Sequence, residues 1–395
     1  MYIINSDDYY EKMRRLIVGL AYCYLWYASI LAEAEATHHR IGILLWYASI
    51  LAGYAALFCP LLPFLLISNK LYRYLTDLFF TCWQLYPTKL CNCSFQVTGD
   101  PIYTEETSIL LMNHRTRTDW NFFWPTLYHS TIGRGKMSYS TKLVLKDGIR
   151  LIPGAGWIMQ MSNFIYLKRK WQEDKDTLQT YINYVSDIRY KHSILLFPEG
   201  TDMSEKTKMQ SDIYAITHNK QKFDYVLHPK PSGFIHLTRQ LLLNGNLDAV
   251  YDVTLIYPDQ IPQSELFLLT GRFPKQVKVH LIRYPKEVLP KTEETLREFL
   301  EQRWQEKEMN IREYHTTGNF LQGKTLRCED DWKMYAALVF WTLLPYITLY
   351  YFIFSSWYRN LVLTHTALLL ATNIVLEGFH NFEMALHRWK KKTIF

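Results

Sequence analysis

Two short stretches of the sequence contain side chains with the chemistry of an acid–base site. In the first, apolar residues 109–112 are followed by Asn113 and His114 and then, after four further residues, by Asp119. On one helix this separation would leave the histidine and the aspartate well apart in angle. We therefore expect His114 to end a buried strand and Asp119 to open the next helix. A carboxylate on one imidazole nitrogen leaves the other free to take a proton from a hydroxyl, so the pair is a candidate general base.

The second stretch, residues 193–202, reads Ser-Ile-Leu-Leu-Phe-Pro-Glu-Gly-Thr-Asp. We expect a second buried strand that stops at Pro198, followed by Glu199, the conformationally permissive Gly200 and the hydroxyl of Thr201. A histidine and an aspartate at this spacing form an ordinary polar turn more often than a catalytic pair. The two stretches taken together, however, are a specific combination.

The combination of Asn-His-x-x-x-x-Asp with Phe-Pro-Glu-Gly-Thr resembles the motifs of the glycerolipid acyltransferase family, which includes the lysophosphatidic acid acyltransferases. Residues 163–169, Asn-Phe-Ile-Tyr-Leu-Lys-Arg, are similar to the family's block Gly-x-x-Phe-Ile-x-Arg, in which only Arg169 matches strictly. Asp202 stands where the family often has arginine. Further segments, such as Leu-His-Pro at 227–229, resemble the branch that contains the lysocardiolipin acyltransferases. The similarity extends over about residues 100–304.

This resemblance implies transfer of an acyl group from acyl-CoA to the hydroxyl of an anionic lysophospholipid. The acceptor would be lysocardiolipin, lysophosphatidylglycerol, lysophosphatidylinositol or lysophosphatidic acid. His114 would remove the hydroxyl proton, and Asp119 would hold the imidazole and stabilise its charged form. A thioester is already activated, so no serine or cysteine nucleophile is needed, and the sequence has no Gly-x-Ser-x-Gly elbow. Acyl-CoA is then a co-substrate, and no cofactor or metal is implied.

The resemblance also implies a place for the substrate's phosphate. Arg169 and the turn Glu199-Gly200-Thr201 would form its cradle from a guanidinium and backbone N–H groups. Glu199 would brace Arg169 or a hydroxyl rather than touch the phosphate. Asn113 is a further candidate for substrate binding, or for capping the turn after His114.

Two other classes of function use the same features. A hydrolase would activate water with the same His114–Asp119 pair and would differ in whether the site excludes water. A catalytically inactive lipid-binding protein would keep the membrane segments, but it would have no need for both intact motifs.

Composition indicates contact with anionic or membrane partners. The formal charge is +7, aromatic residues make up 16%, and there are 29 Tyr and 12 Trp, which favour membrane interfaces. The charge suits an anionic lipid surface or coenzyme A, and it would equally suit nucleic acid, for which the sequence has no motif. The six cysteines are too scattered for a disulfide framework, so we expect reduced thiols.

Three apolar runs predict membrane helices at both ends of the chain. Residues 41–67 carry no charge and exceed the roughly 20 residues that cross a bilayer. Residues 334–358 and 360–376 form two further runs, with Arg359 at the predicted hairpin turn. Basic residues follow the first run and the last one (Lys70, Arg73, Arg388 and residues 390–392), which predicts that these ends and the domain between them face the cytosol.

The predicted organisation is a membrane anchor (residues 1–75), an acyltransferase domain (76–330) and a C-terminal helical hairpin with a basic tail (331–395). The terminal lysines also suggest the membrane of the endoplasmic reticulum, crossed several times, and the glycosylation sequon at Asn92 is then expected to stay unmodified. A weaker apolar run spans residues 16–32. The octapeptide Leu-Trp-Tyr-Ala-Ser-Ile-Leu-Ala occurs at 25–32 and again at 45–52, which suggests a local duplication or a mis-assembled coding sequence.

Between the membrane segments, the sequence predicts an α/β fold with a largely parallel sheet. Strand-like runs at 109–112, 164–167, 194–197 and 250–256 alternate with helical stretches such as 174–188. The two motifs then fall at strand ends, where such sheets bind ligands. Residues 292–308 predict a charged surface helix without a chemical role, with Leu296, Phe299 and Leu300 facing inward. Residues 71–85 predict a helix, either in the membrane interface or in the core.

Overall fold

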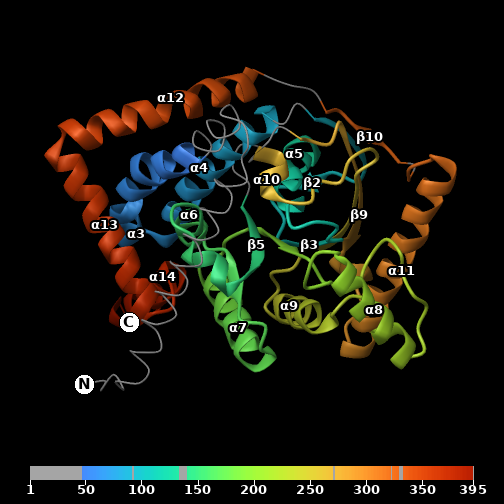
Figure 1. Cartoon of the computed structure of the whole chain (residues 1–395). Helices are drawn as coiled ribbons and strands as arrows, with labels where there is room; N and C mark the ends of the chain where they lie inside the picture. Colours follow the sequence, from blue (N-terminus) through green and yellow to red (C-terminus); the bar gives the residue numbers. More distant parts are fainter. Residues whose placement is uncertain are drawn as a thin grey trace. The chain divides into compact units, whose positions relative to one another are not determined.

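The computed structural model describes residues 47–90, 93–132, 140–269, 272–321, 323–328 and 332–394 (Figure 1). The chain divides into two compact units. The sheet unit comprises Gln84–Val144 and Trp171–Tyr335, and the helical unit comprises Met1–Trp83, Leu145–Lys170 and Ala336–Phe395. Residues 145–170 therefore belong to the same unit as the terminal helices. The boundaries of the acyltransferase domain at residues 76 and 330 stay a prediction.

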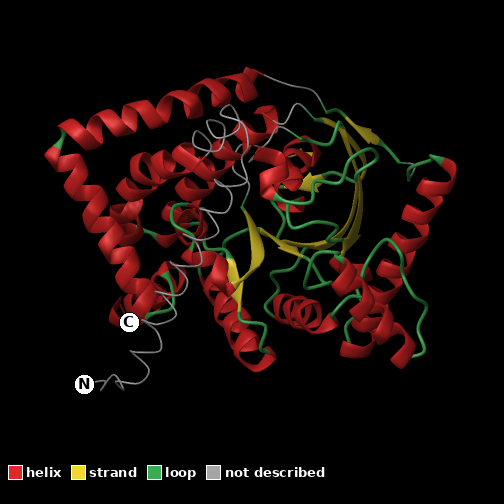
Figure 2. Ribbon diagram, viewed as in Figure 1, coloured by secondary structure: helices red, strands yellow, loops and turns green. Residues whose placement is uncertain are grey.

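The sheet unit is built on one mainly parallel sheet (Figure 2). Its strands follow the order β10-β1-β9-β8-β3-β7-β5. The pairs β3–β7, β3–β8, β5–β7 and β1–β9 are parallel, whereas β8–β9 and β1–β10 are antiparallel. The α/β class predicted from the sequence is confirmed. The strands are β1 (Ser94–Gly99), β3 (Ser108–Met112), β5 (Thr141–Lys146), β7 (Ser193–Leu196), β8 (Ala249–Ile256), β9 (Gln276–Pro285) and β10 (Thr325–Leu326).

The centre of this sheet is buried on both faces. Every residue of β3, β7 and β8 is buried, which explains why these strands read as continuous apolar runs rather than as alternating ones. Ser108 at the start of β3 stands opposite Ser193 of β7 and Ala249 of β8. The three parallel strands therefore end at the same edge, and the segments that follow them meet there.

Helices and a small second sheet complete the unit. α11 begins after Thr292, whose hydroxyl accepts from Thr295 N at 3.2 Å, and it continues past the predicted end to Thr317. Leu296 and Leu300 are buried as predicted. The helices are α5 (Asp119–Ser130), α7 (Trp171–Asp187), α8 (Glu205–Thr217), α9 (Pro231–Leu243), α10 (Glu265–Leu269), α11 (Glu293–Thr317) and the short η4 (Lys286–Val288); β2 (Ile102–Tyr103) pairs with β4 (Thr131–Ile132).

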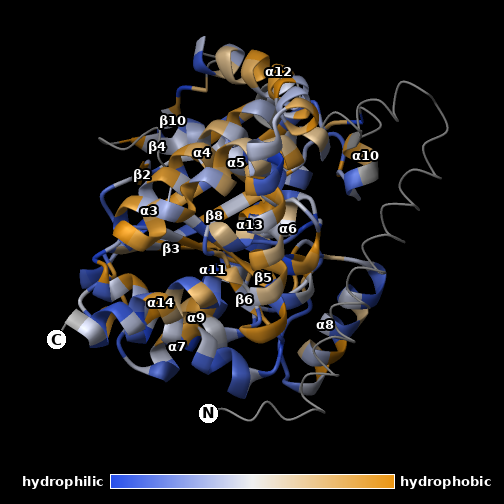
Figure 3. Cartoon of the chain, turned by 90° about the vertical axis from the view of Figure 1, so that its left-hand side faces the viewer, coloured by the Kyte–Doolittle hydropathy of each residue, from blue (hydrophilic) through white to orange (hydrophobic). Residues whose placement is uncertain are grey.

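The helical unit contains the apolar segments. Among the described residues, the helices Tyr47–Ile67 and Trp332–Phe354 are long and apolar enough to cross a membrane, and the bent pair α13–α14 would make a third. Hydrophobic residues lie along α12 (Figure 3). The elements of the helical unit are η1 (Tyr54–Phe58), η2 (Cys59–Leu61), α3 (Leu62–Ile67), α4 (Asn69–Leu90, which continues into the sheet unit), η3 (Asp147–Leu151), α6 (Ala155–Met161), β6 (Ile165–Leu167), α12 (Trp332–Phe354), α13 (Ser356–Val375) and α14 (Phe379–Ile394).

The C-terminal helices correct one prediction from the sequence. Arg359 was predicted to lie at the turn, but α12 ends at Phe354 and Ser355 caps α13, its hydroxyl accepting from Tyr358 N. Arg359 lies in the first turn of α13 and donates to the carbonyl oxygens of Phe352 and Ile353, each at 3.1 Å. A serine is the better helix cap, and the guanidinium satisfies carbonyls that the end of α12 leaves free.

The α4 helix is a core helix, which decides between the two readings of residues 71–85. Tyr72 and Phe80 are buried, and so is Arg73, which forms an ion pair with Glu383 of α14 at 2.8 Å. The apolar run at 16–32, the first octapeptide copy and Asn92 lie outside the described residues.

Candidate active site

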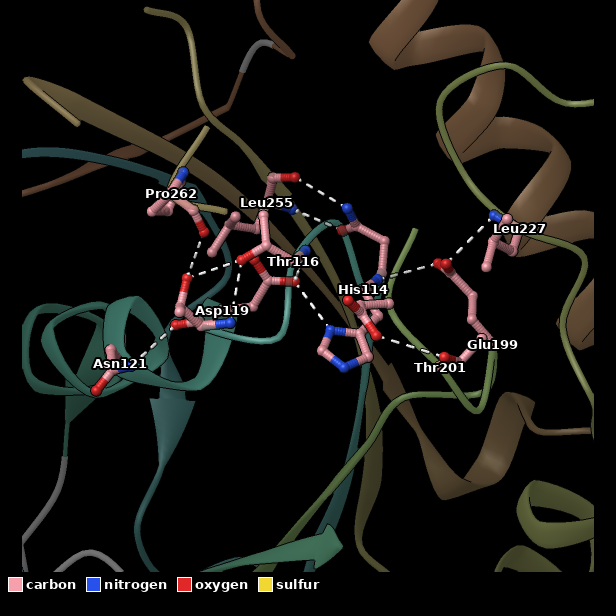
Figure 4. Close-up of polar contacts among 12 residues, drawn as sticks. His114, Thr116, Asp119, Asn121, Glu199, Thr201, Leu227, Leu255 and Pro262 are labelled. Atoms are coloured by element: carbon pink, nitrogen blue, oxygen red, sulfur yellow. Dashed lines mark hydrogen bonds and ion pairs between the residues drawn. The ribbon is translucent and has the colours of Figure 1, made fainter. Parts of the chain in front are cut away.

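His114 and Asp119 meet at the edge of the sheet where β3 ends (Figure 4). β3 stops at Met112, and Asp119 is the first residue of α5, as the spacing predicts. The Nδ1 of His114 lies 3.0 Å from Oδ2 of Asp119. The carboxylate is fully buried, whereas the imidazole is 16% exposed. Because Asp119 accepts the Nδ1 proton, Nε2 is the nitrogen that remains available as a base.

The Asp119 carboxylate is held on both oxygens. Oδ2 also accepts from Thr116 N at 3.0 Å, and Oδ1 accepts from the hydroxyl of Tyr257 at 2.7 Å. Sequence reasoning missed Tyr257, although it directly follows β8, whose end lies at the same sheet edge. The ring of His114 stacks on Phe197 with centroids 4.2 Å apart. Both members of the pair are therefore fixed before any substrate binds.

The surroundings of His114 raise its pKa above the usual value for imidazole. Burial by itself lowers this pKa. The hydrogen bond and charge of Asp119, together with the charges of Glu199 and Asp202, favour the protonated ring and outweigh burial. The imidazole is thus a stronger base than a free histidine, and it needs a higher pH to become neutral.

Tyr257→Phe is expected to lower kcat about three- to tenfold, which corresponds to the loss of about one hydrogen bond, with little change in KM. Without the hydroxyl, Asp119 is more basic and holds the His114 proton more firmly. The acid limb of the kcat–pH profile should therefore move to higher pH. A purely structural role for Tyr257 would lower activity without moving that limb.

Glu199 serves the scaffold of the site. Its carboxylate, only 2% exposed, accepts from His114 N at 3.1 Å, Leu227 N at 3.2 Å and Trp304 Nε1 at 3.2 Å. The main chain of His114 is also tied at its carbonyl, which accepts from Met203 N at 3.1 Å. Glu199 therefore braces the backbone that carries His114.

The α11 helix, predicted to have no chemical role, supports this scaffold. Besides the Trp304 bond, Glu308 accepts from the backbone N–H groups of Asp224, Tyr225 and Val226, at 2.8–3.3 Å. The ammonium of Lys307, buried in the same helix, pairs with Asp252 of β8. The inward face of α11 was predicted from its leucines, but the polar contacts that this face makes were not.

Burial raises the pKa of Glu199 to about 7, although its three N–H donors act in the opposite direction. The folded protein therefore holds a proton that the unfolded chain has released above its own pKa of about 4.3. Stability should decrease as pH rises from about 4.5 to 7, by up to about 3 kcal/mol.

Glu199→Gln is expected to remove most of this pH dependence, because an amide does not ionise. The measurement is the thermal denaturation midpoint in detergent from pH 5 to 8. The wild-type midpoint should fall over this range, and that of the variant should change less. Parallel curves would contradict the raised pKa.

Asn113 joins the end of β3 to the backbone of β8. Its Nδ2 donates to the carbonyl of Leu255 at 2.9 Å, and its Oδ1 accepts from Leu255 N at 2.8 Å. The side chain thus pairs with the backbone of β8 beyond the last backbone pair. Asn113 is only 2% exposed, and its amide positions the strand end; a contact with substrate stays a prediction.

Of the residues predicted to hold the phosphate, the turn Glu199-Gly200-Thr201 lies in the sheet unit. Gly200 has a left-handed backbone (φ +73°), and Thr201 donates to Asp202 Oδ1 at 3.4 Å. Arg169 follows β6 in the helical unit, so its place at the site stays a prediction. Arg117, half exposed, pairs with Glu265 at 2.9 Å. No cluster of metal-ligating side chains occurs in the described part of the chain.

The sequence of this chain is similar to those of known acyltransferases. Residues 94–258 match the family model Acyltransferase, and residues 267–341 match Acyltransferase C-terminus. The chain is 35% identical to lysocardiolipin acyltransferase 1 of Gallus gallus, over 84% of this chain and 90% of that protein. The chain belongs to the acyltransferase family. The resemblance drawn from its motifs is confirmed.

The similar acyltransferases are named for more than one lysophospholipid. Lysophosphatidylinositol acyltransferase 10 of Caenorhabditis elegans is 32% identical, over 72% of this chain and 77% of that protein. The lysocardiolipin acyltransferase 1 of Mus musculus is 36% identical, over 72% and 77%. The acyltransferase match at 94–258 includes His114, Asp119 and Glu199 and ends beyond Tyr257.

Proposed function

We propose that this acyltransferase transfers an acyl group from acyl-CoA to the free hydroxyl of an anionic lysophospholipid. The observation that carries the proposal is the His114–Asp119 pair, which leaves Nε2 available at a partly exposed edge. The names of the relatives, which are acyltransferases of lysocardiolipin and lysophosphatidylinositol, support the class of acceptor. Lysophosphatidylglycerol and lysophosphatidic acid belong to the same chemical class.

In this proposal, Nε2 of His114 accepts the hydroxyl proton as the acceptor oxygen attacks the thioester carbonyl. The new C–O bond forms, the C–S bond breaks, and the leaving thiolate of coenzyme A takes the proton back from the imidazolium. Asp119 keeps the Nδ1 proton in place and stabilises the imidazolium. No covalent acyl-enzyme is needed.

Arg169 is proposed to hold the acceptor's phosphate together with the turn at Gly200 and Thr201. A guanidinium offers two parallel N–H bonds to a phosphate. Glu199 contributes indirectly, because its carboxylate is occupied by three N–H donors of the scaffold.

The test uses purified full-length protein with labelled acyl-CoA, in the presence and absence of lysophospholipids. Acceptor-dependent formation of diacyl phospholipid is the expected result. Release of coenzyme A at the same rate without acceptor would indicate a hydrolase, and the absence of both reactions would indicate a lipid-binding protein. His114→Ala serves as the control for contaminating activity.

We also propose that the protein crosses the membrane of the endoplasmic reticulum several times and that the sheet unit faces the cytosol, where acyl-CoA is available. The candidate membrane helices and the exposed Arg388, Lys391 and Lys392 of α14 support this orientation. The buried Arg73 adds little, because Glu383 neutralises it. Protection of the sheet unit from protease in sealed microsomes would contradict the orientation.

A further inference from the structure

Lys230 lies against the turn at Gly200 because two hydrogen bonds join the segments that carry them. Leu227 N donates to Glu199 Oε2 at 3.2 Å, and Lys230 N donates to the carbonyl of Pro198 at 2.7 Å. A β-carbon added to Gly200 would stand 3.4 Å from Cδ of Lys230 and 3.5 Å from its Nζ. The absence of a side chain at Gly200 thus leaves the lysine close to the backbone of the turn.

The charge of Lys230 has no acidic partner among the described residues. Two lysines that precede it in the sequence are paired: Lys208 with Asp212 at 2.6 Å and Lys220 with Glu301 at 2.7 Å. Lys230 is exposed, and the carboxylate of Glu199, which precedes Gly200, is buried and accepts three N–H groups. An ammonium group is therefore available at the rim of the site.

The turn below Lys230 offers hydrogen-bond donors but no positive charge of its own. The N–H groups of Thr201 and Asp202 make no hydrogen bond within the described residues. The side chain of Asp202 adds negative charge, which would repel an anion. A phosphate bound by these donors therefore needs a cation from another segment, and Lys230 is placed to supply it.

The turn is also directly connected to the catalytic histidine. Met203, at its end, donates to the carbonyl of His114 at 3.1 Å. A phosphate held between Lys230 and the turn would therefore be anchored on the same backbone that positions the general base.

We propose that Lys230 binds a substrate phosphate at the Gly200 turn. The proposal rests on the proposed function, because both substrates carry phosphate: the lysophospholipid in its head group and acyl-CoA in its coenzyme. The shared chemistry is a phosphate ester whose oxygens accept from an ammonium and from backbone N–H groups. Of the two phosphates, we expect Lys230 to bind that of the lysophospholipid acceptor.

The test compares Lys230→Met with Lys230→Arg and with Lys286→Met in the full-length protein. Lys286 is an exposed lysine that directly follows β9. Pro285 of β9 pairs with Ala249, the first residue of β8, so Lys286 lies near the end of β8 that is opposite the site. We expect Lys230→Met to raise the KM for lysophosphatidylinositol about tenfold, as for a lost charge-assisted hydrogen bond, and the effect to shrink at high salt. The KM of Lys230→Arg and of Lys286→Met for lysophosphatidylinositol should stay within about twofold of the wild-type value, since each variant keeps a positive charge at position 230.

The two sources of phosphate give different results. A raised KM for the lysolipid alone assigns Lys230 to the acceptor, and a raised KM for acyl-CoA alone assigns it to the donor. Unchanged values of both constants in Lys230→Met, or a fall in kcat alone, would overturn the proposal. Thermal midpoints check folding, and Lys230→Gln is the second variant if methionine destabilises the protein.

Binding separates this proposal from the proposed function. Calorimetry in detergent measures the affinity of His114→Ala for coenzyme A and for lysophosphatidylinositol, with and without Lys230→Met. A weaker affinity for one of them supports phosphate binding even if the wild-type protein transfers no acyl group. Equal affinities for both would refute the role of Lys230, even if transfer is observed.

Discussion

His114→Ala is expected to lower kcat for acyl transfer by about a hundred- to ten-thousandfold, the usual contribution of a general base. The variant removes Nε2, the nitrogen that the His114–Asp119 pair leaves available as a base, while the Asp119 carboxylate keeps its bonds to Thr116 and Tyr257. The measurement is turnover of labelled acyl-CoA with lysophospholipid, using protein whose thermal midpoint matches that of the wild type.

A loss of only a few-fold in a folded, membrane-bound variant would show that another group removes the proton. Histidines elsewhere provide the control. His218 is exposed on the C-terminal end of α8, and its Nδ1 contacts the carbonyl of Tyr214 at 2.9 Å. His218→Ala should therefore leave kcat unchanged.

Asp119→Asn is expected to cause a loss of similar size, about a hundredfold or more. Thr116 N and the Tyr257 hydroxyl both donate to the carboxylate. Thr116 N lies on Oδ2, together with Nδ1 of His114, whereas the Tyr257 hydroxyl lies on Oδ1, so the single oxygen of an asparagine cannot accept from both donors. If this oxygen takes the place of Oδ2, the ring tautomer is kept but the negative charge that stabilises the imidazolium is lost. If the NH₂ group takes that place, Nδ1 of His114 has to accept, the ring proton moves to Nε2, and the base is lost.

The same variant should change the pH dependence of whatever activity remains. Asp119 is the main group that raises the pKa of His114, in opposition to burial. Only neutral imidazole accepts the substrate proton, so activity in the wild type rises with pH through this raised pKa. With asparagine the pKa falls and the acid limb of the kcat profile should move to lower pH. A limb that stays in place would show that Asp119 does not set this pKa.

The sequence predicted the central strands and the position of the pair, because each is encoded locally. Continuous apolar runs end at Met112 and Leu196, and a polar motif follows each of them. Strand β8 was found for the same reason. The spacing of the apolar residues did not predict where α12 ends and α13 begins. The helix cap is Ser355, whereas the turn was predicted at Arg359.

The partners of the site could not be predicted, since each contact joins distant segments. Tyr257 is 138 positions from Asp119, and Trp304 is 105 positions from Glu199. Nothing in the local pattern of a charged helix indicates that one indole will donate to a buried carboxylate. The bonds between Asn113 and the backbone of Leu255 were not predicted for the same reason, since they join positions 142 apart.

The backbone of His114 is held by two hydrogen bonds that do not depend on its side chain: its N–H donates to Glu199 and its carbonyl accepts from Met203. Inherited missense changes at this codon should therefore yield a protein of normal abundance that escapes degradation by cellular quality control. Changes at Glu199 or Trp304 should instead deplete the protein. Immunoblots should show normal amounts of an inactive protein for changes at His114 and reduced amounts for changes at Glu199 or Trp304. A lipid profile alone would not distinguish the two kinds of allele.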